Sequence, residues 1–338
     1  MARPRFLPDN FTLSLVATVV FASFLPARGI FAPIFSNLTT AAIVLLFFLH
    51  GAKLSREALV AAMTHWRLHL CILCSTFVMF PLLAIVLKPV LLPLVTPALY
   101  VGVMYTSMLP STVQSSIALT SIAKGNVPAA VCAASASSVL GIFITPLLAG
   151  LILQTHGGGG NALHMIGSIV LELLVPFVAG QIARTWIGDW VGRNRAMLKL
   201  VDNSSIILTV YSAFSAAVIG GLWHQIPAIA IGGLVVVNLV LLGIALGLTT
   251  LASRKMGFSK ADQITIMFCG SKKSLAAGIP MAKVLFAGAA GGAGTIVLPL
   301  MLFHQIQLMI CSVLAQRFGA RDLSLDDEGT AATTAAVK

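Results

Sequence analysis

Two adjacent lysines, Lys272 and Lys273, have the clearest chemical meaning in this sequence. Nine uncharged residues flank the pair on each side, within the apolar segment 262–286. If a second half-helix begins near Ser274, its free backbone N–H groups and its dipole favour an anion there, as the two ammonium groups do. We therefore expect an anionic ligand. In the alternative interpretation, residues 262–271 form a loop and the lysines are solvated at its end.

A second polar stretch surrounds Pro110 in the apolar segment 97–123. Proline has no backbone N–H and its ring clashes with the preceding turn, so we expect a helix to kink or open there. The freed backbone groups need partners, since unsatisfied groups are costly in lipid. The neighbouring side chains either bond to the freed backbone groups at a simple kink or line a binding site, and we favour the binding site. These side chains are Ser111, Thr112, Gln114, Ser115 and Ser116.

The two stretches together define a candidate site for an anion. Its expected substrate-binding residues are Thr112, Asn126, Lys272, Lys273 and Ser274. The segment 127–153 adds Ser135, Ser137 and Ser138, for which ligation and close helix packing are equally good interpretations. Glu172 is a carboxylate in the interior of the predicted span 163–184. It pairs with a lysine, carries a coupling proton, or lies near the outer membrane interface.

Several kinds of chemistry have no motif in this chain. A phosphate-binding GxxxxGK[ST] sequence is absent, which argues against ATP as the energy source. The seven histidines form no metal-ligand cluster, and no nucleophile–base pattern is present. The five cysteines lie in apolar stretches and their odd number gives no closed disulfide set. We expect no enzyme, no metal centre and no cofactor beyond a coupling ion, Na⁺ or H⁺.

The composition indicates where these segments lie. The chain has 338 residues, of which 58% are hydrophobic and 9% charged, and its mean hydropathy is +0.99. A soluble domain carries about 25% charged residues. Too little polar surface remains for a soluble enzyme or a nucleic-acid-binding protein, although the net charge is +11. The sequence therefore predicts an all-α protein that crosses the lipid bilayer many times.

Long uncharged runs, divided at turn signals, predict ten transmembrane helices. Their expected ranges are 10–27, 31–51, 68–87, 97–123, 127–153, 163–184, 201–221, 226–252, 262–286 and 293–316. With the N-terminus inside, 16 Lys and Arg residues fall in inner segments and 3 in outer ones. This split predicts a plasma (inner) membrane protein with both termini cytoplasmic, and it accounts for the net charge without a polyanionic partner.

Ten spans divide into two halves at Gly157–Gly160, which gives repeats over 10–155 and 160–317 and a disordered tail over 318–338. Five spans is an odd number, so related halves enter the membrane from opposite sides, as in many secondary transporters. Ser116-Ile117-Ala118 in the fourth span has a counterpart in Ser274-Leu275-Ala276 in the ninth. We expect residues 1–317 to form one integral membrane domain.

Several segments also resemble the bile acid:sodium symporter superfamily. Pro110–Ser116, Ala123–Val127 and Ile144–Leu148 resemble its fourth and fifth spans. The stretch from Phe268 to Ser274, followed by Gly278-Ile279-Pro280, is similar to the ninth span of the divergent symporter-like (SBF-like) branch. The resemblance covers about residues 8–318. It implies a panel of spans 1, 2, 6 and 7, and a core whose interrupted spans 4 and 9 cross near mid-membrane.

The resemblance also implies two sodium sites behind the crossing. The residues near those expected positions are Gln114, Ser115, Ser116, Ser135, Ser138 and Ser271. However, sodium-coupled members place a Glu and a Gln on span 9, where this chain has Phe268 and Lys272. Sodium needs oxygen ligands and a lysine offers only donors. Conventional two-sodium coupling is therefore not expected, and an ammonium group is a candidate to occupy the space of a sodium ion.

Two functional hypotheses follow. The first is a secondary active transporter of a small organic anion that works by alternating access. The second is a membrane regulatory protein that acts through a partner, for example in the control of calcium entry, as some relatives on the divergent branch suggest. The sequence specifies neither the substrate nor the oligomeric state.

Overall fold

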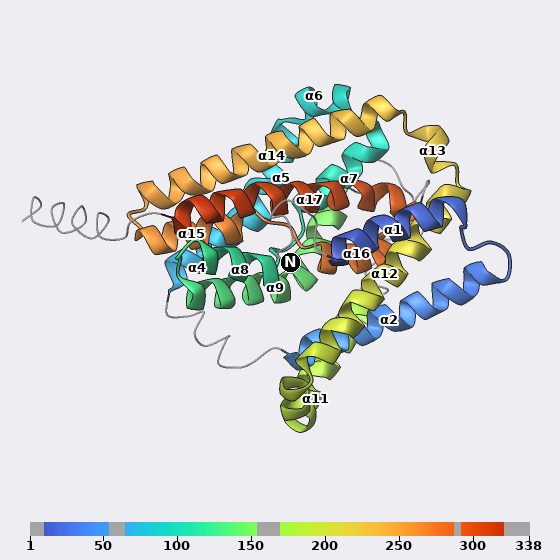
Figure 1. Ribbon diagram of the computed structural model, residues 1–338, viewed down its shortest axis with the longest axis horizontal. Helices are drawn as coiled ribbons and strands as arrows, with labels where there is room; N and C mark the ends of the chain where they lie inside the picture. The colour runs from blue at the N-terminus through green and yellow to red at the C-terminus, as the bar shows by residue number, and fades with distance from the viewer. Residues whose placement is uncertain (1–9, 54–64, 154–169, 287–291, 321–338) are drawn as a thin grey trace, which may run out of the picture.

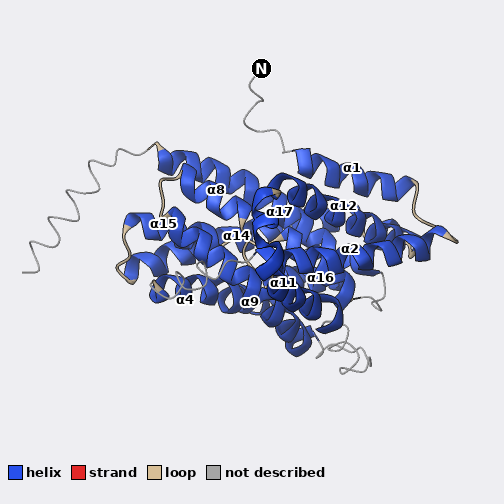
Figure 2. Cartoon of the chain, turned by 90° about the horizontal axis from the view of Figure 1, so that it is seen from below, coloured by secondary structure: helices blue, strands red, loops and turns tan. Residues whose placement is uncertain are grey.

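The structure is a computed structural model that describes residues 10–53, 65–153, 170–286 and 292–320. Every regular element in these ranges is a helix, and they contain no strand. Figure 2 shows how the helices lie against one another in a single assembly. An all-helical fold suits a hydrophobic chain, because a helix pairs its own backbone groups and needs no water to do so.

Six helices in the described ranges are long and apolar enough to cross a membrane. They are Phe31–Lys53, Trp66–Val86, Val127–Leu153, Ala196–Ile219, Ile229–Lys255 and Ala293–Gly319. The other four predicted spans differ in character. The first is a shorter apolar helix, the sixth is only partly described, and the fourth and ninth are interrupted. The total of ten crossings remains a prediction.

Four helices form one group at the blue and yellow side of the molecule (Figure 1). They are α1 (Asn10–Phe24), α2 (Phe31–Lys53), α11 (Val175–Arg193) and α12 (Arg195–Ile219). Glycines allow α2 and α11 to approach closely. An added Cβ at Gly51 would collide with the carbonyl of Phe177, and one at Gly180 would collide with that of Phe48. Small residues at such a crossing are the usual means of packing helices in lipid.

Most of the remaining helices form a second group. Its members are α4 (Trp66–Cys74), η1 (Ser75–Met79), α5 (Phe80–Val86), α7 (Pro97–Ser107), α8 (Gln114–Ile122), α9 (Val127–Leu153), α14 (Ala228–Lys255), α15 (Lys260–Gly270), α16 (Leu275–Leu285) and α17 (Gly292–Gly319). The segments α4, η1 and α5 run on without a gap, and η1 is a π-helical turn inside that helix. The short helices α6 (Lys88–Leu91), η2 (Leu92–Leu94) and α13 (Leu222–Gln225) lie in connections.

Both predicted interruptions are present. The fourth span consists of α7 and α8, which are separated by residues 108–113, and the ninth consists of α15 and α16, separated by residues 271–274. Each half is 9 to 11 residues long. Neither half is long enough to cross a bilayer alone, since a crossing takes about 20 residues. The loop interpretation of residues 262–271 is therefore wrong, because α15 covers all of them except Ser271.

The segment between the sixth and seventh predicted spans is almost entirely helical. α11 continues to Arg193 and α12 begins at Arg195, so that only Asn194 separates them. The segment contains no proline that would end the helices at the membrane surface. Two other predicted features, the Gly157–Gly160 divide and residues 321–338 of the tail, lie outside the described residues.

Candidate functional site at the helix crossing

The first break begins where α7 ends, at Ser107. Pro110 has no N–H to continue the helix. The last turn of α7 closes with hydrogen bonds that span three residues instead of four, such as the one from the N–H of Met108 to the carbonyl of Tyr105 at 3.0 Å. The N–H of Ser111 would pair with Ser107 in an unbroken helix, but it donates instead to Oγ of Ser137 on α9 at 3.0 Å. The carbonyls of Ser107 and Leu109 are thereby left for other donors.

The second break is held open by a side chain of another helix. The N–H of Lys273 donates to Oε1 of Gln307 on α17, and Nε2 of Gln307 donates to the carbonyl of Lys273, both at 2.9 Å. The side-chain amide of Gln307 therefore supplies the hydrogen-bond partners that a continuous helix would give to the backbone of Lys273. The next half-helix, α16, begins with Ser274 as its N-cap, whose Oγ accepts from the N–H of Ala277 at 3.2 Å. This is the usual role of a serine at that position.

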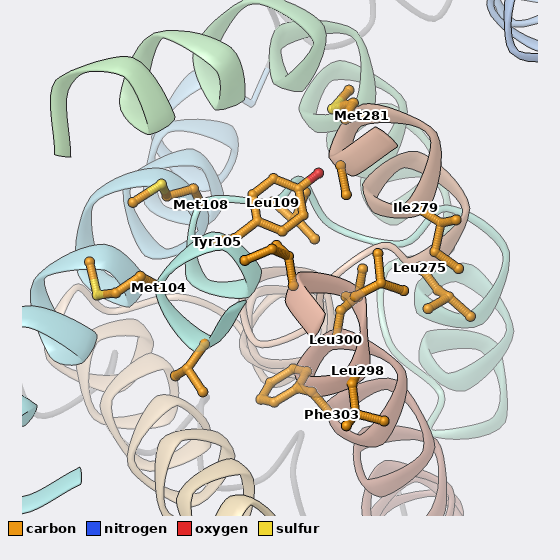
Figure 3. Packing of buried hydrophobic residues seen from close by; sticks show 14 of the residues in the cluster. Met104, Tyr105, Met108, Leu109, Leu275, Ile279, Met281, Leu298, Leu300 and Phe303 are labelled. Carbon is orange, nitrogen blue, oxygen red and sulfur yellow. The ribbon is translucent and has the colours of Figure 1, made fainter. Parts of the chain in front are cut away.

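The two breaks bond directly to each other. The N–H of Ser274 donates to the carbonyl of Pro110 at 2.8 Å. Oγ of Ser111 donates to the carbonyl of Cys269, at the end of α15, at 2.6 Å. Figure 3 shows the apolar packing beside this contact, where Leu109 lies between Leu275 and Ile279 on one side and the α7 side chains on the other. The sequence prediction that the two broken spans meet is confirmed.

A glycine on a neighbouring helix allows the crossing to be compact. An added Cβ at Gly141 of α9 would lie 2.6 Å from Cβ of Pro110. Proline is rigid and has no other rotamer to adopt, so only glycine fits there. On the opposite side, Oη of Tyr105 donates to the carbonyl of Gly278 at 2.7 Å and ties α7 to α16.

Lys273 is fully buried in the crossing, and its ammonium group has three carbonyl acceptors. Nζ donates to the carbonyls of Thr76 and Ser107 at 2.7 Å and of Leu109 at 2.9 Å. It also lies 4.2 Å from the ring centre of Phe80, within cation–π range. An ammonium has three N–H donors, so all of them are used here. The charge also lies at the C-terminal end of α7, where the helix dipole favours a cation.

The carbonyl of Thr76 is available because of the π-helical turn η1. In this turn the N–H of Phe80 bonds to the carbonyl of Ser75, five residues earlier. The same register would pair the carbonyl of Thr76 with residue 81, which is a proline and has no N–H. Sequence reasoning did not identify Thr76 or Gln307 as site residues. The available signals were Pro81 in an apolar span and a glutamine in the middle of another.

Lys272 is equally buried but has fewer partners. Its Nζ donates to the carbonyl of Ser115 at 2.8 Å and lies 5.4 Å from the ring centre of Phe268. The backbone around this acceptor carries a cluster of hydroxyl groups. Oγ1 of Thr112 lies 2.7 Å from Oγ of Ser115 and 3.1 Å from Oγ of Ser116. The structure thus brings Lys272 into contact with Ser115, whose hydroxyl group belongs to this cluster.

Other predicted site residues lie at varying distance from this cluster. Ser271 is buried, and its Oγ donates to the carbonyl of Met267 at 2.6 Å. On α9 the hydroxyl that contacts the break is that of Ser137, whereas Ser135 and Ser138 are half-buried. Gln114 begins α8 with an exposed side chain. Glu172 lies in the π-helical turn η4 (Val170–Leu174), and its side chain lies outside the described part of the structure.

Asn126 lies at the far end of α8 and α15 rather than at the crossing. Its Nδ2 donates to Oδ1 of Asp262 at 2.8 Å, and its backbone N–H donates to Oγ1 of Thr265 at 3.0 Å. Its Oδ1 accepts from the N–H of Ala129 at 3.1 Å, which caps α9. These bonds use both ends of the side-chain amide to join the start of α9 to the start of α15.

The electrostatics of the crossing are dominated by the two lysines. Neither has a carboxylate partner among the described residues, where the one salt bridge joins Lys53 of α2 to Asp202 of α12. The described side chains also contain no cluster of three or more His, Cys, Asp or Glu that would hold a metal ion. The arrangement is chemically suited to hold negative charge beside Lys272, while the ammonium of Lys273 is held by the backbone.

Comparisons with known proteins give a consistent result. The model of the SBF-like CPA transporter family matches residues 9–320. A Pseudomonas aeruginosa protein named "Uncharacterized protein PA2026" is 64% identical over 321 residues, 95% of this chain and 96% of the relative. The Escherichia coli protein named "Putative symporter YfeH" is 57% identical over 92% of both chains. The mouse protein named "Sodium/bile acid cotransporter 7" is 30% identical over 92% of both chains.

Proposed function

This chain belongs to the SBF-like CPA transporter family, and we propose that it moves a small organic anion across the membrane by alternating access, without conventional sodium coupling. The family is one of transporters, so the chain is a multi-pass membrane transport protein and not an enzyme. The substrate class, the coupling mode and the orientation in the membrane are the proposed parts.

The observation that carries the proposal is the pair of broken helices whose ends bond to each other around two buried lysines. Discontinuous helices near the middle of the membrane are a common way to build a transporter site, because unwound backbone and helix ends are available to a ligand. A buried charge in a membrane segment is costly and usually marks a functional place. The N-terminus of α16 adds positive potential to that of the lysines.

We infer that Lys272 is the lysine that meets the substrate. All three donors of Lys273 bond to carbonyls, whereas Lys272 has one carbonyl acceptor, that of Ser115. The hydroxyl group of Ser115 in turn lies 2.7 Å from that of Thr112. A carboxylate or sulfonate that binds beside Lys272 gains a charge-assisted hydrogen bond, which is stronger than a neutral one. Because the side chain is fully buried in this conformation, the bound state requires a rearrangement at the crossing.

The doubt about sodium coupling rests on the coordination of Lys273. Three backbone carbonyls at 2.7–2.9 Å from one cationic atom are oxygen ligands of the kind that a bound alkali ion would take. Here the chain's own ammonium fills that position. Some relatives carry "sodium" in their names. We propose that in this chain a fixed cation takes the place of a coupling sodium ion.

The remaining architecture is proposed from the same family. The group α1, α2, α11 and α12 would act as the panel and the second group as the core, in two inverted repeats of five spans each. The excess of Lys and Arg in predicted inner segments supports cytoplasmic termini in the plasma membrane. The two groups would rock against each other around the crossing.

Flux by the purified protein alone tests the proposal. The protein is reconstituted into liposomes, and uptake of radiolabelled taurocholate and of a panel of other organic carboxylates and sulfonates is measured. We expect at least one anion to be taken up by the wild type and not by protein-free liposomes. Lys272→Gln should abolish that uptake, because the substrate loses its charge partner.

The matched control is Lys199→Gln, which removes one charge from an exposed position on α12. We expect it to transport like the wild type. Absence of flux for the whole panel, with the protein folded and inserted, would favour the regulatory hypothesis. Equal flux by Lys272→Gln and the wild type would remove Lys272 from the mechanism.

A further inference from the structure

A groove on the outside of the second helix group has no role in the proposed transport. It has a volume of about 440 Å³ and lies between α14, α15 and α17. Its walls are mostly apolar and include Leu246, Met267, Leu314 and Phe318. This volume is within the range of small-molecule sites in proteins.

The floor of the groove is open because of a glycine. An added Cβ at Gly247 of α14 would meet nothing within 4 Å. Glycine in the middle of a helix costs about 1 kcal/mol relative to alanine, so Gly247 makes α14 less stable than an alanine at that position would. Thr250, which also lines the groove, donates its hydroxyl to the carbonyl of Leu246 at 2.7 Å. Because this hydroxyl is bonded within α14, the part of the groove wall that Thr250 forms is largely apolar.

One end of the groove is positively charged. Arg254 lines it in the last turn of α14, beside Lys255, and Arg317 is in the last turn of α17. The Arg254 and Arg317 side chains are exposed, and neither has an acidic partner among the described residues. The nearby carboxylate of Asp262 accepts from Asn126 and Ser259, both at 2.8 Å. The charge at this end is thus available to an outside anion.

We propose that this groove binds an anionic phospholipid, with an acyl chain along the apolar walls and the phosphate at Arg254. The combination of an apolar groove and a cation at one end matches the two parts of such a lipid. Basic residues at the ends of transmembrane helices are a known means of recognising anionic head groups. The planar guanidinium group presents two parallel N–H donors that match two phosphate oxygens, whereas a lysine ammonium acts as a point charge without that fixed geometry.

The groove also has a physical connection to the crossing. The ring of Phe318, in its wall, contacts the ring of Phe268 edge to face with centres 6.3 Å apart. The ring of Phe268 is the one beside Nζ of Lys272, at 5.4 Å. A lipid in the groove would therefore support α15 directly behind the lysine that we assign to the substrate.

Native mass spectrometry of the full chain, purified in detergent, tests the site. Retention of phosphatidylglycerol is compared with that of phosphatidylethanolamine and of glycerol 3-phosphate. We expect one phosphatidylglycerol to be retained preferentially and glycerol 3-phosphate not to be retained. Gly247→Leu fills the groove and should weaken phosphatidylglycerol retention about tenfold. Arg254→Gln should also weaken retention about tenfold, which corresponds to about 1.4 kcal/mol, because the phosphate loses a charge-assisted hydrogen bond.

Two controls keep the outcome decisive. Gly243→Leu adds the same side chain to the same helix, at a position where a Cβ also meets nothing within 4 Å but which does not line the groove. Lys199→Gln matches the charge change of Arg254→Gln. Both should retain lipid like the wild type. Retention unaffected by Gly247→Leu and Arg254→Gln, or retention of glycerol 3-phosphate alone, would each overturn the proposal.

Discussion

At the scale of single residues, Lys272 and Lys273 are adjacent in sequence but differ in their hydrogen bonds. The ammonium of Lys273 bonds to carbonyls of Thr76, Ser107 and Leu109, which come from two different spans. The carbonyl of Thr76 has no helical donor because Pro81 stands where the donor would be. The carbonyl of Ser107 has none because the helix ends before Pro110. The lysine thus satisfies defects that Pro81 and Pro110 create. We interpret Lys273 as a structural cation and Lys272 as the substrate ligand.

This interpretation predicts the effect of Lys273→Ala on stability. The substitution leaves three buried carbonyls without a donor, at about 1–3 kcal/mol each, partly offset by removal of a buried charge. We expect the melting temperature of the detergent-solubilised protein to fall by about 5–10 °C, at roughly 2–4 °C per kcal/mol for a chain of this size class. Differential scanning fluorimetry measures the change.

Small cations provide a second readout on the same variant. Methylammonium or Na⁺ can enter the space left by the side chain and take the three carbonyls as ligands, so either should raise the melting temperature of Lys273→Ala. Neither should raise that of the wild type or of Lys260→Ala, which removes an exposed lysine at the start of α15. A Lys273→Ala protein that melts like the wild type, with no response to cations, would disprove the structural role.

At the scale of elements, the break of the fourth span depends on close contact with α9. Pro110 opens the helix, and Gly141 of α9 leaves room for its ring. Ser137, one turn earlier on α9, accepts the N–H that the break frees. The position of the break is therefore fixed by a neighbouring helix as well as by its own sequence.

Two alanine substitutions at helical glycines should have opposite effects. Gly141→Ala places a Cβ 2.6 Å from Cβ of Pro110 and should destabilise the protein by about 1–3 kcal/mol through overpacking. Gly243→Ala, in open space on α14, should stabilise it by up to about 1 kcal/mol through helix propensity. Thermal melts of the two variants, side by side, measure the difference. A Gly141→Ala protein as stable as Gly243→Ala would show that the crossing is not tightly packed.

The elements also show what sequence reasoning can and cannot reach. Pro110 and the adjacent lysines are local signals, and they were sufficient to place both breaks. The partners of Lys273 were not predictable in the same way, because Thr76 is almost 200 positions away and its availability depends on a π-helical turn. Asn126 was assigned to substrate from a local motif, but its bonds to Asp262 and Thr265 join helix ends.

At the scale of the whole molecule, the two helix groups touch where α12 meets α16 and α17. An added Cβ at Gly294 of α17 would lie 2.7 Å from Cβ of Ala217 on α12. Nζ of Lys283 on α16 donates to the carbonyl of Ser36 on α2 at 3.0 Å. If the groups rock against each other during transport, these contacts must open and close.

Cross-linking this contact should stop transport. In the double variant Ala217→Cys with Gly294→Cys, the two Cβ atoms lie close enough for a disulfide after a small adjustment of the helices. We expect a mild oxidant to abolish anion uptake and a reductant to restore it. Each single cysteine variant serves as the control for the five native cysteines, which are unpaired in the structure. Uptake that persists in the fully cross-linked protein would argue against rocking of the two groups.

If a fixed ammonium at the crossing replaces a coupling sodium ion, anion uptake needs no external Na⁺. The initial rate of anion uptake into proteoliposomes is measured with external Na⁺ and again with choline in its place, at constant ionic strength. We predict the same rate in both solutions. A fall in choline to the level of protein-free liposomes would show that Na⁺ drives the uptake and that the ammonium does not replace it.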